Sequence, residues 1–158
     1  MSAWFLLAAW LAPLLLLPFT GTRAARWLPA LAVLPGLVVA VSVPEGAAVE
    51  LGWLLLGVQL ALDGTARLFL LYSSLAWLAA ALYILLRPDA ATGKGSFLLC
   101  FLLAMAGNLL LILAADMLTF YAGFALMGLS AYGPVSYTHL TLPTTIEVCW
   151  GGWGAAGV

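Results

Sequence analysis

The stretch Asp116-Met-Leu-Thr-Phe-Tyr-Ala-Gly-Phe-Ala-Leu-Met-Gly-Leu-Ser-Ala-Tyr132 decides the fold class of this chain. It is an apolar run that follows one acidic residue and contains several small side chains. Helical spacing puts Tyr121, Ala125, Gly128 and Tyr132 on one face. Small residues on a membrane helix let a neighbouring helix approach closely. The stretch therefore predicts a membrane-embedded helix, with this face as a packing seam or the lining of a channel.

The composition of the whole chain predicts the same environment. Of its 158 residues, 66% are hydrophobic and 7% are charged, whereas soluble domains are about 45–50% apolar and about 25% charged. A chain this apolar cannot cover a globule with polar surface, so we expect a lipid bilayer as its solvent. The net charge of −1 argues against a nucleic-acid partner, which requires clustered Lys and Arg.

Charged residues divide the chain into apolar segments of membrane-crossing length, which is about 20 residues. The predicted fold class is all-α, a polytopic transmembrane helical bundle of about five spans within residues 1–134. The spans are 3–19, 27–43, 67–86, 96–115 and 117–133. Segment 44–65 has an apolar middle that is too short to cross, so we expect it to be extended or interfacial against the bundle. Trp53 suits the headgroup boundary.

The basic residues predict one orientation. Arg23 and Arg26 lie in the first loop, and Arg87 and Lys94 lie in the third. Because positive loops face the cytoplasm, the N-terminus is expected outside. No Lys or Arg precedes the first apolar run, so it reads as a retained span and not as a cleavable signal peptide. Arg67, at the start of the third span, is expected to reach to the outer interface.

The sequence changes character after Pro134. Segment 136–145, Ser-Tyr-Thr-His-Leu-Thr-Leu-Pro-Thr-Thr, is rich in hydroxyl and β-branched residues. It resembles translated adapter sequence at the broken ends of assembled environmental sequences, which predicts that the genuine protein stops near Val135. The alternative is a polar loop followed by a disordered terminus. In either case 135–158 is a non-native-looking or disordered tail, and we assign no function to His139.

Few side chains are candidates for chemistry. Asn108, in the fourth span, is the deepest strongly polar residue, and we expect it to make an interhelical hydrogen bond or to line a water-filled half-channel. Asp116 lies at the outer end of the fifth span. Ser73 and Ser74 can bond carbonyl groups of their own helix, so they receive no role. No residues have the spacing of a catalytic, cofactor or metal site.

Three segments carry a family resemblance. They are Leu60-Ala-Leu-Asp-Gly-Thr-Ala-Arg-Leu-Phe69, Leu113-Ala-Ala-Asp-Met-Leu-Thr-Phe120 and Leu126-Met-Gly-Leu-Ser-Ala-Tyr132. They resemble the antiporter-like membrane subunits of respiratory complex I, membrane hydrogenases and Mrp-type cation/proton antiporters. The similarity covers about residues 51–133, and Ala125 stands where the family has a glutamate in its fifth helix.

The resemblance implies an N-terminal fragment of a proton-conducting or Na⁺/H⁺ antiporter-like subunit in a bacterial inner membrane. Other membrane subunits would be its partners, and flavin and Fe–S chemistry would belong to them. The chain itself would be at most a non-catalytic subunit of an NADH:quinone oxidoreductase-like translocase. Because Ala125 replaces the glutamate, a non-conducting scaffold subunit is the alternative. A small membrane protein outside the family is the third possibility.

Overall fold

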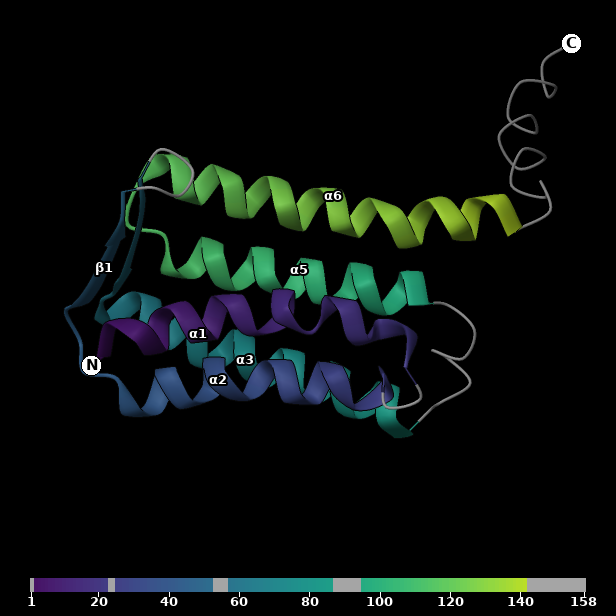
Figure 1. Cartoon of the computed structure of the whole chain (residues 1–158), viewed down its shortest axis with the longest axis horizontal. Helices are drawn as coiled ribbons and strands as arrows, with labels where there is room; N and C mark the ends of the chain where they lie inside the picture. The colour runs from purple at the N-terminus through teal and green to yellow at the C-terminus, as the bar shows by residue number, and fades with distance from the viewer. Residues whose placement is uncertain (1, 23–24, 53–56, 87–94, 142–158) are drawn as a thin grey trace, which may run out of the picture.

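The fold is a helical bundle with a small β-hairpin at one end (Figure 1). The computed structural model describes residues 2–22, 25–52, 57–86 and 95–141, with side chains described for 4–22, 25–52, 57–86 and 95–130. The helices are α1 (Ser2–Leu15), α2 (Leu28–Ser42), α3 (Gly64–Leu86), α5 (Gly95–Leu113) and α6 (Met117–Thr141). Short 3-10 helices, Leu17–Gly21 and Ala25–Trp27, lie between α1 and α2. Trp53 lies outside the described residues.

Within the described residues, four segments are long and apolar enough to cross a membrane, and they support a membrane protein. They are Trp4–Gly21, Ala25–Ser42, Gly64–Leu86 and Gly95–Leu113. Each overlaps one of the first four predicted spans. The predicted fifth span lies at the start of α6, where the apolar part with described side chains, Met117–Ser130, is shorter. The helix itself continues past Pro134 to Thr141, beyond the predicted end at 133.

The helices run side by side, and α5 lies in the middle of the arrangement. It contacts α1, α2, α3 and α6, whereas α6 packs mainly on α5 (Figure 1). The core is made of aliphatic side chains from α1, α2, α3, α5 and the second strand. Prolines within α1 and α2 are accommodated, because packed neighbours can compensate for the helix bonds that proline removes.

The predicted extended segment is a two-stranded antiparallel hairpin. Strand β1 is Ala47–Leu51 and β2 is Val58–Leu62, with Ala47 opposite Leu62 and Leu51 opposite Val58. Val58, Leu60 and Leu62 alternate with more exposed residues and are buried, as strand geometry requires when one face is covered. The all-α prediction holds for the bulk of the chain, and the hairpin adds a cap at the end where α2 ends and α3 begins (Figure 1).

Candidate functional site

A polar cluster joins three helices in the interior of the bundle. Asn108 of α5 accepts hydrogen bonds at Oδ1 from the hydroxyl of Ser73 and from the indole Nε1–H of Trp77, the latter at 3.1 Å; both donors belong to α3. Its amide nitrogen points to the sulfur of Met127 on α6, at 3.8 Å. The predicted interhelical hydrogen bond of Asn108 is therefore present. It connects α3, α5 and α6 through one side chain.

The cluster lies at mid-depth in its helices. Ser73 is nine positions after Gly64, which is about 14 Å along a helix of about 35 Å. The ring of Trp77 packs edge-on against Phe101 with centroids 5.0 Å apart, so apolar side chains border the polar atoms. An Asn hydrogen bond between membrane helices contributes about 0.6–2 kcal/mol, enough to fix the register of α3 against α5.

The helices α5 and α6 come closest at two glycines that flank this cluster. A Cβ added to Gly107 would lie 2.6 Å from the backbone nitrogen of Met127, and one added to Gly123 would lie 2.7 Å from the backbone nitrogen of Leu111. Real Cβ atoms do not approach backbone so closely. The absence of side chains at these glycines therefore allows direct backbone contact between the two helices.

The predicted small-residue face of α6 is not the face that packs on α5. Tyr121 is 55% exposed, and Ala125 and Gly128 are also exposed. A Cβ on Gly128 would meet nothing within 4 Å. The side chain of Tyr132 lies outside the described set. The sequence pattern could not tell which face of α6 would be covered by α5.

Asp116 connects the turn before α6 to the hairpin. One carboxylate oxygen accepts a hydrogen bond from the backbone N–H of Thr119 at 2.9 Å, and the other accepts from the backbone N–H of Gln59 at 3.1 Å. The carbonyl of Gln59 in turn accepts from the N–H of Ala115 at 2.9 Å. Asp116 therefore caps α6 and holds β2 against the end of α5. Asp116 does not join the cluster around Asn108.

These contacts change the acidity of Asp116. Hydrogen bonds from the side chain and then from the backbone of Thr119 lower the pKa of the carboxyl below its ordinary value, with a further contribution from the Gln59 N–H. A lowered pKa in the folded state means that the folded chain binds the proton less well than the unfolded chain. The resulting stability is present above the ordinary pKa of Asp and is lost as the pH falls through the lower, folded value.

Asp116→Asn is expected to remove the part of the acid dependence of stability that comes from the lowered pKa of Asp116. An amide keeps one oxygen to accept from the Thr119 N–H and so preserves the cap, but it carries no charge and presents an NH2 donor to the Gln59 N–H. The variant should lose the bond to Gln59 and should respond less to acid below about pH 4. The measurement is the midpoint of thermal unfolding in detergent between pH 2.5 and 7. Glu50→Gln is the control, because the side chain of Glu50 is exposed and makes no hydrogen bond or ion pair within the described part of the chain. Identical acid profiles for Asp116→Asn and the wild type would contradict the assignment.

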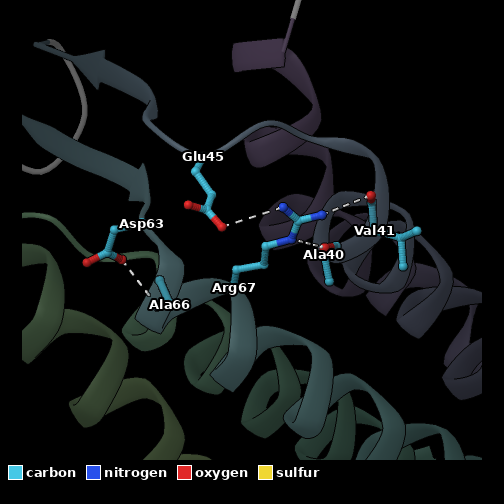
Figure 2. Close-up of polar contacts among 6 residues, drawn as sticks. All are labelled: Ala40, Val41, Glu45, Asp63, Ala66 and Arg67. Atoms are coloured by element: carbon cyan, nitrogen blue, oxygen red, sulfur yellow. Dashed lines mark hydrogen bonds and ion pairs between the residues drawn. The ribbon is translucent and has the colours of Figure 1, made fainter.

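A second polar contact ties the start of α3 to the end of α2 (Figure 2). The guanidinium of Arg67 donates to the carbonyl oxygens of Ala40 at 2.8 Å and Val41 at 3.1 Å. Its Nη1 lies 3.7 Å from a carboxylate oxygen of Glu45. The last carbonyls of a helix have no partner in that helix. Arg67 therefore binds the end of α2 within the bundle. The sequence had predicted only that its side chain would extend to the outer interface.

Three members of the cluster around Asn108 were not predicted from sequence, namely Ser73, Trp77 and Met127. Ser73 and Trp77 are four positions apart on α3 and so share a face, which was the available signal. The prediction that Ser73 has no role is wrong, because its hydroxyl donates a hydrogen bond to Asn108. Ser74 is buried, and its hydroxyl has no partner among the described residues. Met127 could not be found without knowing how α6 is rotated.

The described residues contain no group of three His, Cys, Asp or Glu side chains that could hold a metal ion. No family model, curated protein or solved structure matches the chain. The polar cluster around Asn108 is therefore the candidate site, on its geometry alone. It can order water or a neighbouring polar group, and it offers no nucleophile or metal ligand set.

Proposed function

We propose that the chain is part of an antiporter-like membrane subunit whose parent moves protons, or exchanges Na⁺ for protons, in a respiratory NADH dehydrogenase, hydrogenase or Mrp-type complex. The observation that carries this proposal is the cluster around Asn108. It joins the helices whose sequences resemble the third and fifth helices of that family. A polar side chain at this depth is costly unless it binds another polar group or water, and an ion pathway needs such groups.

A non-conducting scaffold subunit is the second candidate, and one observation favours it. Between their first and last turns, the described helices contain no Asp, Glu, Lys, Arg or His. At position 125, where the family has its glutamate, the chain has an exposed alanine. A carboxylate there would accept a proton and shift the pKa of a nearby lysine, and Ala125 can do neither. The scaffold role would use the same helix packing without ion movement.

The proposed location is the plasma membrane of a bacterium, with the hairpin on the outer side. The described charges at the hairpin end are mainly acidic, namely Glu45, Glu50, Asp63 and Asp116 beside Arg67. Arg26 lies before α2, at the opposite end. This asymmetry supports the orientation because basic residues favour the cytoplasmic side.

The test is Asn108→Leu in the parent protein, measured in inverted membrane vesicles from cells that contain the assembled complex. If Asn108 lines an ion pathway, proton or Na⁺ movement should fall at least several-fold while the amount of assembled complex stays constant. If the residue serves only packing, flux per assembled complex should be unchanged, and the loss should be about 0.6–2 kcal/mol of stability.

Ser73→Ala is the matched control. It removes one donor to Asn108 but leaves the amide in place, so a pathway through Asn108 should retain most of its flux. Flux that is independent of both residues, in a complex that fails to assemble without the subunit, would contradict transport through this cluster and support the scaffold.

A further inference from the structure

A groove opens on the surface between the start of α3 and the end of α5, with a volume of about 310 Å³. Its lining combines a carboxylate and a hydroxyl with apolar side chains: Asp63, Thr65, Ala66, Phe69, Leu111 and Ile112. The polar residues belong to the first turn of α3 and the residue before it, while Phe69 lies a further turn along the helix. The groove therefore has polar groups from the start of α3 beside apolar side chains from α3 and the end of α5.

The carboxylate at the mouth of this groove has capacity for another partner. One oxygen of Asp63 accepts a hydrogen bond from the N–H of Ala66 at 3.2 Å (Figure 2). The other oxygen accepts no hydrogen bond from the described residues, and the nearby cation, Arg67, is bound to Ala40, Val41 and Glu45. Asp63 is exposed, so its charge is available to a cationic group from outside the chain.

The negative charge extends beyond Asp63. A Cβ on Gly64 would lie 3.7 Å from a carboxylate oxygen of Glu45, which places a second carboxylate beside the first turn of α3. Arg67 offsets the charge of Glu45 but not that of Asp63. An anionic head group would be repelled here, and an ammonium group that donates hydrogen bonds to carboxylate would be attracted.

We propose that this groove binds a phospholipid with a primary amine head group, of the phosphatidylethanolamine type. Its ammonium group donates to Asp63 and Thr65, and one acyl chain lies along Phe69, Leu111 and Ile112. Phe69 is 61% exposed, so the apolar floor is accessible from the bilayer. The proposal requires only that the chain is embedded in a membrane, and it does not depend on ion transport.

A second groove of about 330 Å³ gives an internal comparison. It is lined by Phe5, Val38, Ser42, Val43 and Pro44 and has no charged residue in its lining. An acyl chain bound there would carry no preference for an amine head group. A preference for an amine head group at the first groove should therefore depend on Asp63 and not on apolar area alone.

The experiment is native mass spectrometry of the full chain, purified in mild detergent and equilibrated with lipids of identical acyl chains. The probes are phosphatidylethanolamine, its mono- and dimethyl derivatives, phosphatidylcholine and phosphatidylglycerol. Retention should fall stepwise as methyl groups replace N–H donors. Phosphatidylethanolamine should be retained about two- to fivefold more than phosphatidylcholine, which is the range expected of an exposed ion pair. Retention of phosphatidylglycerol should not fall in Asp63→Asn, because its head group carries no ammonium.

Asp63→Asn is the decisive variant, because asparagine caps a helix as well as aspartate does and removes only the charge. Asp63→Asn should abolish the preference for phosphatidylethanolamine over phosphatidylcholine, whereas Glu50→Gln should leave this preference unchanged. Equal retention of the methylation series by the wild type would overturn the proposal. A preference that survives Asp63→Asn would also overturn it. The methylation series uses the wild-type chain alone, so it decides the matter even if a variant does not fold.

Discussion

Gly107→Ala and Gly123→Ala are each expected to destabilise the chain by about 1–3 kcal/mol or more. The new methyl group would lie under 3 Å from backbone atoms of the facing helix, which cannot move aside as a flexible side chain can. The two helices would have to separate, and this would also disturb the bond between Asn108 and Met127. The measurement is the free energy of unfolding in mixed micelles, by titration with a denaturing detergent.

Gly128→Ala is the matched control, on α6 with Gly123. A Cβ at this position meets nothing within 4 Å, and alanine favours a helix over glycine by about 1 kcal/mol. The same chemical change should therefore be neutral or stabilising at 128 and destabilising at 107 and 123. Equal effects at all three positions would show that α5 and α6 do not meet through Gly107 and Gly123.

Arg67→Met is expected to lower the free energy of unfolding by about 2–4 kcal/mol. Methionine keeps an apolar stem of similar shape but cannot donate to the carbonyls of Ala40 and Val41, and hydrogen bonds to a charged group contribute about 1.5–3 kcal/mol each. The arginine side chain is 34% exposed, so solvent screens part of this effect. The same detergent titration measures the loss.

Two further variants separate the contributions of Arg67. Glu45→Gln removes only the ion pair, whose glutamate is 61% exposed, and should cost no more than about 1 kcal/mol. Arg67→Lys keeps the charge but loses the planar fork that reaches two carbonyls, so it should fall between wild type and Arg67→Met. A loss for Glu45→Gln as large as that for Arg67→Met would mean that the ion pair, and not the helix end, is the important contact.

The membrane-helix character of the chain could be predicted from sequence because it depends on composition and on the spacing of charges. The position of Asn108 inside the bundle followed from its place within an apolar run. Segment 44–65 was expected to be extended or interfacial because its apolar part is too short to cross, and Ala47–Leu51 and Val58–Leu62 are strands. These are local properties, because each depends on one contiguous stretch of residues.

Rotation of one helix against another could not be predicted in the same way. Gly107, Gly123 and Gly128 look alike in sequence, yet the first two meet backbone and the third meets nothing. The contact of Arg67 with the end of α2 joins residues 26 and 27 positions apart, and no local pattern encodes it. Such choices depend on the whole surface that each helix presents to its neighbours.

The contact between the hairpin and Asp116 has a consequence for the time course of synthesis. Gln59 and Asp116 are 57 positions apart, and a ribosome adds about 5–20 residues per second, so roughly 3–11 seconds separate their appearance. During this interval β2 exists without the residue that holds it, while α3 and α5 are still being made. The contact that holds β2 at the hairpin end of the bundle can therefore form only after Asp116, the residue before α6, has been made.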